Sequence, residues 1–391
     1  MTDRNVQNAI PVAPLRIINL NTSVTLGRQI DEQIVRRRKK SFASNPGDLT
    51  TLGYQKDSYL VDISLVRNST GEGKAVINES IRGADLFIIA DVMNYGETYP
   101  LHGSSHPSSP DDHYQDLKRV IMACSGHPRR ITVIMPYLYE GRQNIRFINE
   151  SLDCAMVLQE LTDMGVSSIV TFDAHDSRVQ NAIPLEGFDN FYTSYQFIKA
   201  VLDSDENLQV DSDSLMIVSP DEGGISRAVY YATLLGVNMG MFFKRRDYTG
   251  GGTGGENPVI AIEFLGNDLS GKDVILVDDM IATGTSVLEA CAEIKKRGAA
   301  HVYVCATFGL FTKGLEVFDK AYKENLFDRI FTTNLNYCPD QLLDKPYYEN
   351  VDMSTYLSLI IDTINNDTSV SNLLDATSRI QELLAKRNHT D

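Results

Sequence analysis

The sequence lacks the excess of positive charge that binds polyanions. Its 391 residues carry 36 Lys and Arg against 52 Asp and Glu, a net charge of −16. This acidity argues against general binding of nucleic acid or of an anionic membrane, because both carry charge of the same sign. If such a protein handles phosphates, it must concentrate its cations locally.

Paired cysteines and long apolar runs are also missing. The five cysteines are scattered, with no CxxC spacing, which indicates reduced thiols, most of them in the core of a cytosolic protein. No apolar run approaches the length of a membrane span, and residues 1–16 lack the continuous apolar core of a signal peptide. We therefore expect a cytoplasmic protein without a membrane partner.

Short apolar runs alternate with helical patterns along the chain. The runs at residues 15–20, 130–136, 167–172, 215–218 and 274–277 have the length and composition of buried strands. Helical segments between strands predict parallel sheets, and 391 residues are enough for two domains. We therefore expect an α/β protein with two domains and mainly parallel sheets.

Three stretches depart from this alternation. Residues 94–112 are rich in Gly, Ser, Pro and His, and we predict a loop there and another at residues 339–350. The histidines of the first loop could suggest a metal site, but no Cys or spaced carboxylate supports one, so a surface loop is the stronger interpretation. Residues 371–386 have a helical pattern.

The most informative stretch is DVILVDDMIATGTS at residues 273–286. Its buried strand ends in two carboxylates, Asp278 and Asp279, which can accept the hydroxyls of a sugar or hold hydrated Mg²⁺. Small and hydroxyl-bearing residues then lead into a helix, where backbone N–H groups can surround a phosphate. Gly284 lets the backbone approach that phosphate closely. The pattern favours a site for a phosphorylated sugar over an ordinary turn with solvated aspartates.

Two further predicted strands end in groups that can bind ligands. PYLYEGRQNIR at residues 136–146 places Arg142 and Gln143 where α/β sheets bind their ligands, and FDAHD at residues 172–176 places His175 between aspartates. The arginine can contact a phosphate or a base, and the histidine can contact Mg²⁺ or phosphate. Taken singly, a solvated arginine and a structural histidine remain alternatives.

Two segments of the second half suggest a diphosphate site. VSPDEGG at residues 218–224 opens a helix with Gly-Gly, an anion nest in which Asp221 could hold the metal of a diphosphate. FFKRR at residues 242–246 precedes a glycine-rich stretch at residues 248–256. Cations at the root of a flexible loop suggest a lid over phosphates, with a solvated hairpin tip as the alternative.

Together these blocks make the chain resemble the ribose-phosphate pyrophosphokinase (PRPP synthetase) family over about residues 15–374. The order of the blocks carries the resemblance: NESIRGADLFII, PYLYEGRQNIR, FDAHD, VSPDEGG, FFKRR, ILVDDMIATGTS and NDTSVSNLL. The resemblance implies two tandem phosphoribosyltransferase-type domains. The implied segments are an N-terminal arm at 1–14, an ATP-side domain at 15–192, a ribose 5-phosphate-side domain at 193–370 and a C-terminal helix at 371–391.

The resemblance also implies a role for each matching residue. The implied ribose 5-phosphate ligands are Asp278, Asp279, Thr283, Gly284, Thr285 and Ser286. The implied diphosphate loop is Asp221, Gly223 and Gly224, and the implied ATP contacts are Arg142, Gln143, Glu72 and His175. The implied Mg²⁺ contacts are His175, Asp221 and Asp173. The implied catalytic pair, which stabilises the transferring group, is Lys244 and Arg246.

The family's reaction transfers the β,γ-diphosphoryl group of MgATP to the C1 hydroxyl of ribose 5-phosphate, giving PRPP and AMP. Such a transfer needs in-line positioning and charge neutralisation more than covalent chemistry. The resemblance therefore implies Mg²⁺ as cofactor and ATP and ribose 5-phosphate as partners. It also implies a cytoplasmic homo-oligomer, a dimer or an assembly of dimers, without nucleic-acid or membrane partners.

The chain departs from the family pattern in ways that leave two alternatives open. The family's FxDGE stretch, which reaches adenine on a neighbouring subunit, is NSTGE here at residues 68–72. Asn144 replaces an acidic residue, Phe308 replaces a histidine, and Ala282 replaces an aspartate, as in many PRPP-consuming transferases. The alternatives are a non-catalytic PRPP synthetase-like regulatory subunit and, less strongly, a PRPP-using phosphoribosyltransferase.

Overall fold

The structure is a computed structural model that describes residues 10–44, 51, 53–246 and 259–388. The chain divides into two compact units, the first made of Met1–Tyr192, Asn334–Pro339 and Asp352–Asp375, the second of Thr193–Thr333, Asp340–Val351 and Ala376–Asp391. Both units are α/β with mainly parallel sheets, as expected. This division differs from the predicted boundaries of 15–192 and 193–370, because residues 352–370 pack in the first unit.

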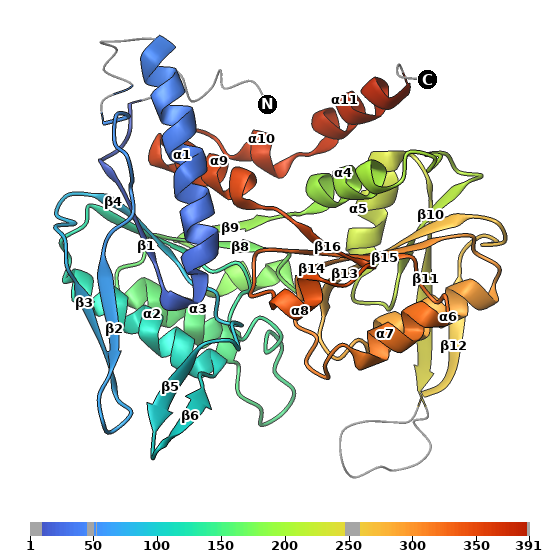
Figure 1. The fold of residues 1–391 in the computed structure, drawn as a ribbon, viewed down its shortest axis with the longest axis horizontal. Helices are drawn as coiled ribbons and strands as arrows, with labels where there is room; N and C mark the ends of the chain where they lie inside the picture. Colours follow the sequence, from blue (N-terminus) through green and yellow to red (C-terminus); the bar gives the residue numbers. More distant parts are fainter. Residues whose placement is uncertain (1–9, 45–50, 52, 247–258, 389–391) are drawn as a thin grey trace. The chain divides into compact units, whose positions relative to one another are not determined.

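The first unit is built on a five-stranded parallel sheet in the order β1-β4-β7-β8-β9 (Figure 1). Its strands are β1 (Leu15–Asn19), β4 (Asp85–Ile89), β7 (Arg130–Ile134), β8 (Ser168–Phe172) and β9 (Gly187–Phe191). Every residue of β4 is buried. A parallel strand that is covered on both faces has this pattern, because helices pack on either side of it.

Both faces of this sheet are covered by helices. The helices are α1 (Val24–Ser44), α2 (Pro110–Cys124), α3 (Asp153–Asp163) and α9 (Ser354–Asn365). Leu86 of β4 shares one core with Leu117 of α2 and Leu158 of α3. On the other face, Tyr356 of α9 meets Phe172 edge-on, with 6.1 Å between ring centroids. The first unit therefore has a core on each side of its sheet.

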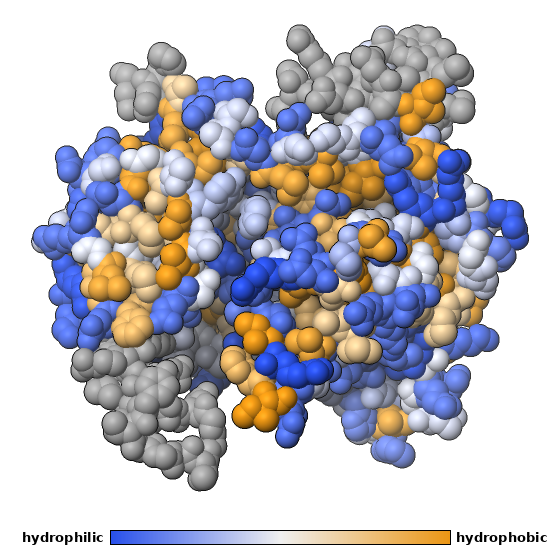
Figure 2. Space-filling view, turned by 180° about the vertical axis from the view of Figure 1, so that it is seen from behind, coloured by the Kyte–Doolittle hydropathy of each residue, from blue (hydrophilic) through white to orange (hydrophobic). Residues whose placement is uncertain are grey.

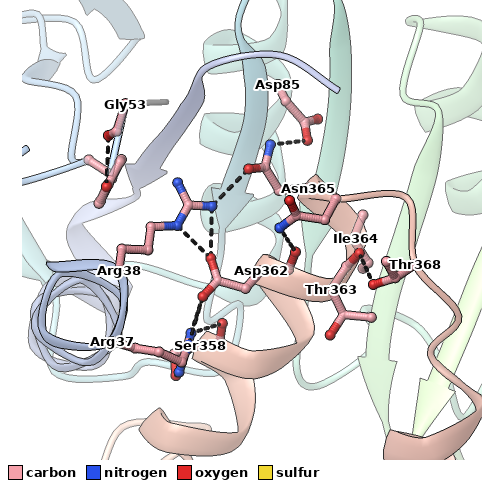
Figure 3. A network of polar contacts seen from close by, with 12 residues as sticks. Arg37, Arg38, Gly53, Asp85, Ser358, Asp362, Thr363, Ile364, Asn365 and Thr368 are labelled. Atoms are coloured by element: carbon pink, nitrogen blue, oxygen red, sulfur yellow. Dashed lines mark hydrogen bonds and ion pairs between the residues drawn. The ribbon is translucent and has the colours of Figure 1, made fainter. Parts of the chain in front are cut away.

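A buried ion-pair network fixes α9 to α1 (Figure 3). Arg38 Nε donates to Asp362 Oδ1 at 2.8 Å, and Arg37 Nε donates to Asp362 Oδ2 at 2.8 Å. Arg38 also donates to Asn365, which in turn donates to Asp85 at the start of β4 (2.8 Å). The side chains of Arg38 and Asp362 are each 3% exposed. These contacts attach a late segment of the chain to the first unit.

Two antiparallel hairpins extend from the first unit. They pair β2 (Ile63–Arg67) with β3 (Gly73–Ile77) and β5 (Thr98–Leu101) with β6 (Ser104–Pro107). The prediction of a loop at residues 94–112 was therefore wrong. His102 and Gly103, with φ of 51° and 75°, form a two-residue turn of the left-handed kind that tight hairpins prefer.

The second unit contains a seven-stranded sheet in the order β12-β11-β10-β13-β14-β15-β16. The strands are β10 (Leu215–Ser219), β11 (Asn238–Arg246), β12 (Val259–Leu265), β13 (Asp273–Ile281), β14 (Val302–Gly309), β15 (Arg329–Thr333) and β16 (Tyr348–Val351). All pairs are parallel except β11 with β12. A short helix, α8 (Asp340–Leu343), and β16 occupy the stretch predicted as a loop at residues 339–350, so that prediction was wrong.

Helices also cover both faces of the second sheet (Figure 1). One core joins β10, β13 and β14 to α4 (Ser194–Ser204), α5 (Ile225–Leu235) and α11 (Thr377–Asn388). The opposite face carries α6 (Thr285–Lys296) and α7 (Glu316–Lys323). The helix predicted at residues 371–386 is broken at Asp375 into α10 (Ser371–Leu374) and α11.

Two expectations from composition bear on the described structure. None of the helices in the described ranges is both long and apolar enough to cross a bilayer. All five cysteines are free, and four of them are buried. Their burial agrees with the prediction that most of them are core residues.

Candidate active site

The second unit brings two of the predicted loops to adjacent strands. β10 and β13 are parallel neighbours, with Val218 opposite Leu276. From β10 the chain crosses through α5 to β11 on one side, and from β13 it crosses through α6 to β14 on the other. The strand order therefore reverses between β10 and β13, and ligands of open α/β sheets bind beyond the carboxyl ends of strands at such a point.

Asp278 and Asp279 lie near the carboxyl end of β13. Asp278 and Asp279 are part of the strand, which runs to Ile281 and so extends beyond the predicted end at residue 277. The Asp279 N–H donates to Asp278 Oδ1 at 2.9 Å. Asp278 remains in register with β14, opposite Ala306. The backbone that carries the two carboxylates is therefore part of the sheet and not of a loop.

Gly284 forms the tight entry into α6. Its φ is +82°, and a Cβ added there would lie 2.2 Å from the ring of Phe318, so only glycine fits this turn. The Thr285 N–H donates to Thr283 Oγ1 at 3.3 Å, and the N-cap residue Gly284 itself has no side chain that could cap α6. A helix start with a glycine N-cap and hydroxyls beside it is suited to a phosphate, and Ser286 adds a further hydroxyl in the first turn of α6.

The loop after β10 forms an anion nest. Asp221 Oδ1 accepts the N–H groups of Gly223 at 2.9 Å and of Gly224 at 3.3 Å. Ser219 Oγ donates to the Asp221 carbonyl at 2.7 Å, and a Cβ on Gly224 would lie 2.5 Å from that hydroxyl. The N–H groups of this loop thus bind one carboxylate oxygen of the same chain. Helix α5 follows the loop, and its N-cap residue Gly224 has no side chain that could cap it.

The carboxylates of the two loops influence each other. Burial raises the pKa of Asp278 well above its usual range, and the nearby charges of Asp279 and Asp221 raise it further. The Arg227 guanidinium lies 4.0 Å from Asp278 and opposes this rise in pKa. Sequence reasoning missed Arg227. Its position three residues after Gly224, one turn into α5, was the available signal.

The predicted catalytic pair lies at the end of β11. Lys244 is in register with Ile262, and Arg246 with Val259 of the antiparallel partner β12. The side chains of this pair, and the predicted lid at residues 248–256, lie outside the described residues. The roles of Lys244 and Arg246 therefore stay predictions.

In the first unit, the predicted ATP residues lie on exposed loops. Arg142 and Gln143 follow β7 and are both exposed, and the Gln143 N–H donates to the Glu140 carbonyl at 2.8 Å. The same loop exposes Phe147 (67%) and Ile148 (91%). Figure 2 shows several places where apolar residues reach the surface of one face. Glu72 is exposed in the turn between β2 and β3.

The loop after β8 carries the predicted metal contacts Asp173 and His175. Asp173 is buried with a φ of 40°, and its N–H donates to the Phe191 carbonyl at 2.9 Å. His175 is exposed. Asp176 accepts from Arg178 and caps the following short helix. The loop thus leaves His175 accessible to a ligand and engages Asp176 in its own structure.

The predicted metal ligands come from both units, His175 and Asp173 from the first and Asp221 from the second. Among the described residues, no group of three or more His, Cys, Asp and Glu side chains forms a ready metal cage. Mg²⁺ usually keeps several waters and binds through one or two carboxylates and substrate phosphates, so a site for it does not require such a cage. The roles of His175, Asp173 and Asp221 as metal ligands stay predictions.

Two family models match the chain. The N-terminal domain of ribose phosphate pyrophosphokinase matches residues 15–165, and the phosphoribosyl transferase domain matches residues 197–337. The first covers the strands β1, β4 and β7 and the helices of the first unit up to α3, and the second includes the loops after β10 and β13. The two models occur in the order that the resemblance implies.

Curated relatives match nearly the whole chain. The ribose-phosphate pyrophosphokinase of Maricaulis maris is 27% identical over 86% of this chain and 99% of its own length. That of Chlorobaculum tepidum is 28% identical over 87% of this chain and 95% of its own. The crystal structure of phosphoribosylpyrophosphate synthetase from Mycobacterium smegmatis has the same fold, with a TM-score of 0.71, 19% identity, and coverage of 90% of this chain and 99% of that one. The chain therefore belongs to the ribose-phosphate pyrophosphokinase family.

Proposed function

We propose that this chain is an active ribose-phosphate pyrophosphokinase. It transfers the β,γ-diphosphoryl group of MgATP to the C1 hydroxyl of ribose 5-phosphate and releases PRPP and AMP. The observation that carries this proposal is the pair of helix starts at Gly224 and Gly284, which follow the neighbouring strands β10 and β13 and whose N-cap residue has no side chain. A phosphorylated sugar and a diphosphate each need one such anion site.

Ribose 5-phosphate binds at the loop after β13. The start of α6, with the hydroxyls of Thr283, Thr285 and Ser286, holds the 5-phosphate. Asp278 and Asp279 accept the hydroxyls of the ribose, which requires ionised carboxylates. Arg227 supports this role because its charge opposes the raised pKa of Asp278.

The transfer itself forms one P–O bond and breaks another. The C1 oxygen of ribose attacks the β-phosphorus, the bond to the bridging oxygen of the α-phosphate breaks, and AMP leaves with that oxygen. The proton of the C1 hydroxyl passes to solvent. Asp221, Gly223 and Gly224 hold the diphosphate, and Lys244 and Arg246 stabilise the negative charge that develops on it.

The ATP side of the reaction uses loops of the first unit. Arg142 and Gln143 contact the nucleotide, with Glu72 and His175 as further contacts, and their exposure supports this role. The carboxylates of Asp221 and Asp173, with His175, would hold Mg²⁺. When bound, Mg²⁺ neutralises and aligns the phosphates of ATP. We further propose a cytoplasmic homo-oligomer, a dimer or an assembly of dimers; the five free cysteines support a reducing location.

A non-catalytic regulatory subunit is the second candidate. The observation that favours it is NSTGE at residues 68–72, where only the last two residues match the family's adenine-contacting stretch. This stretch forms the closed turn between β2 and β3, in which the Asn68 N–H donates to the Glu72 carbonyl at 2.8 Å. None of its five residues has an aromatic side chain on which adenine could stack. A PRPP-using transferase is disfavoured by the match to the N-terminal domain model.

The experiment is turnover of the purified protein with ATP, Mg²⁺ and ribose 5-phosphate, with AMP and PRPP measured separately. The active enzyme should form AMP and PRPP in equal amounts. Lys244→Ala should lose about 100-fold or more of the rate, with an unchanged circular dichroism spectrum and melting temperature. A protein that turns nothing over alone, but changes the rate of an active synthetase mixed with it, would establish the regulatory alternative.

A further inference from the structure

The site proposed for the 5-phosphate has no positive charge in its own loop. Residues 282–286, the sugar loop, offer backbone N–H groups at the start of α6 and three hydroxyls, but none of the five is Lys or Arg. A phosphate monoester carries about −1.5 to −2 charge at pH 7. In a chain with a net charge of −16, such a group calls for a local cation from another segment of the same unit.

The segment that follows β14 is attached to the sugar loop. β14 is the parallel neighbour of β13, so both strands end at the same edge of the sheet. The N–H groups of Leu310 and Phe311 donate to the Ile281 carbonyl at 2.9 and 3.1 Å, and the Thr312 N–H donates to the Ala282 carbonyl at 2.9 Å. The backbone after β14 is therefore fixed directly beside the first residue of the sugar loop.

Aromatic packing fixes the same segment to the start of α6. The ring of Phe311 meets that of Phe318 in α7 edge-on, with 4.9 Å between centroids, and Phe318 also lies against Gly284, the N-cap of α6. Figure 1 shows α6 and α7 on the same face of the second sheet. The Gly314 N–H donates to the Phe311 carbonyl at 2.9 Å, which closes a tight turn with Lys313 at its tip.

Lys313 is a cation without a partner. Its side chain is exposed, and within the described part of the chain its ammonium group has no hydrogen bond or ion pair. Cations of the neighbouring helices differ in this respect, since Lys296 of α6 pairs with Glu293 at 3.4 Å and Lys320 of α7 pairs with Glu324 at 3.8 Å. The charge of Lys313 is therefore available to a ligand.

One carboxylate lies close to this turn. A Cβ added to Gly314 would come within 2.6 Å of Glu316 Oε2. Glu316 is exposed and makes no ion pair with Lys313. A phosphate that carries nearly two negative charges attracts a cation more strongly than a single solvated carboxylate does. The long flexible stem of lysine lets its ammonium group move to such a phosphate.

We infer that Lys313 binds the 5-phosphate of the sugar phosphate and supplies the cation that the sugar loop lacks. This inference rests on the proposed function, because it takes the start of α6 as the site of that phosphate. Lysine binds phosphate as a point charge without a fixed geometry. We therefore expect Lys313 to strengthen the binding of the phosphorylated sugar and not to act on the transfer of the diphosphoryl group.

The test is calorimetric titration of the full-length protein with ribose 5-phosphate in the presence of Mg²⁺ and the absence of ATP. Lys313→Gln should weaken binding about tenfold, as the loss of one charge-assisted hydrogen bond predicts. Lys313→Arg keeps the charge and should bind within about twofold of the wild type. Lys296→Gln, in the last turn of α6, is the matched control and should leave the affinity unchanged.

Two further readouts separate a charge effect from a structural one. Added salt should narrow the difference in affinity between the wild type and Lys313→Gln, because it screens exposed charges. In turnover, Lys313→Gln should raise KM for ribose 5-phosphate about tenfold, with kcat and KM for ATP unchanged. The melting temperature should stay that of the wild type.

The inference is overturned if Lys313→Gln binds ribose 5-phosphate as tightly as the wild type, or if Lys313→Arg binds as weakly as Lys313→Gln. Equal losses in Lys313→Gln and Lys296→Gln would also overturn it. Each of these results leaves the proposed function in place. A wild-type protein that binds no ribose 5-phosphate at millimolar concentration would instead overturn the proposed function and this inference together. Because binding is measured without ATP, a protein that binds the sugar but does not turn it over still tests Lys313.

Discussion

In the proposed function, sugar binding depends on the charge pair that Asp278 forms with Arg227. The raised pKa of Asp278 means that its ionised form is lost as pH falls through that raised value. Arg227→Met removes the opposing cation 4.0 Å away, which raises the pKa further. We expect kcat/KM for ribose 5-phosphate to fall about 10- to 100-fold at neutral pH. The acid limb of its pH profile should move to higher pH.

A matched control distinguishes this effect from the loss of any arginine. Arg329 pairs with Glu349 at 3.7 Å at the start of β15, on a surface where its side chain is 43% exposed. Arg329→Met should leave the pH profile in place, and Arg227→Lys should shift the acid limb less than Arg227→Met. An acid limb that stays fixed in Arg227→Met would show that Asp278 does not act as an ionised group.

Gly284 can be tested as the close-packed entry into α6. Gly284→Ala combines backbone strain at φ +82° with a clash against Phe318 at 2.2 Å. We expect the free energy of unfolding in urea to fall by about 2 kcal/mol or more. Gly236→Ala is the control, because its φ of +68° brings the strain but nothing lies within 4 Å of the added Cβ. Equal losses in the two variants would show that packing against Phe318 contributes nothing.

At the residue scale, the sequence predicted groups whose roles follow from their neighbours in the chain. Asp278 and Asp279 end a buried strand, and Gly224 and Gly284 start helices, so the local pattern was sufficient. Arg227 of α5 was missed because its partner Asp278 lies on β13, 51 positions along the chain. Only the parallel pairing of β10 and β13 brings them within 4.0 Å. The ligand roles of these residues stay predictions.

At the scale of elements, the contact of α1 with α9 gives a stability test. Asp362→Ala leaves Arg38 buried without its carboxylate, and we expect it to lower the free energy of unfolding by about 3–5 kcal/mol. Lys320→Ala removes the exposed pair of Lys320 in α7 with Glu324, the C-cap of that helix, at 3.8 Å, and should cost about 0.5 kcal/mol or less. Urea denaturation compares the two variants. If Asp362→Ala costs no more than Lys320→Ala, the network does not hold α9 in place.

The elements that sequence reasoning missed share a physical cause. The β5–β6 hairpin is short, and its only alternation is that of Tyr99 and Leu101 in β5 opposite the polar strand β6, so its turn at His102 and Gly103 carried the clearer signal. The β16 strand follows a four-residue helix in a stretch with no clear period. By contrast, β4 and β14 are buried along their whole length, and their apolar runs predicted them well.

At the scale of the whole molecule, composition and alternation predicted the α/β class and the mainly parallel sheets. They could not predict the division of the chain into units. Asp352–Asp375 belongs to the first unit because Asp362 and Asn365 meet Arg38 and Asp85, and these long-range contacts leave no local pattern. The break at Asp375, after which α11 joins the second unit, was missed for the same reason.

Diphosphoryl transfer is the central claim, and the fate of individual phosphates tests it most directly. The protein is incubated with ribose 5-phosphate, Mg²⁺ and ATP labelled either at the α- or at the γ-phosphorus, and the products are separated. We predict that the γ label appears in PRPP and the α label in AMP, in equal amounts. Label from the α-phosphorus in ADP, or γ label released as inorganic phosphate without labelled PRPP, would contradict the account.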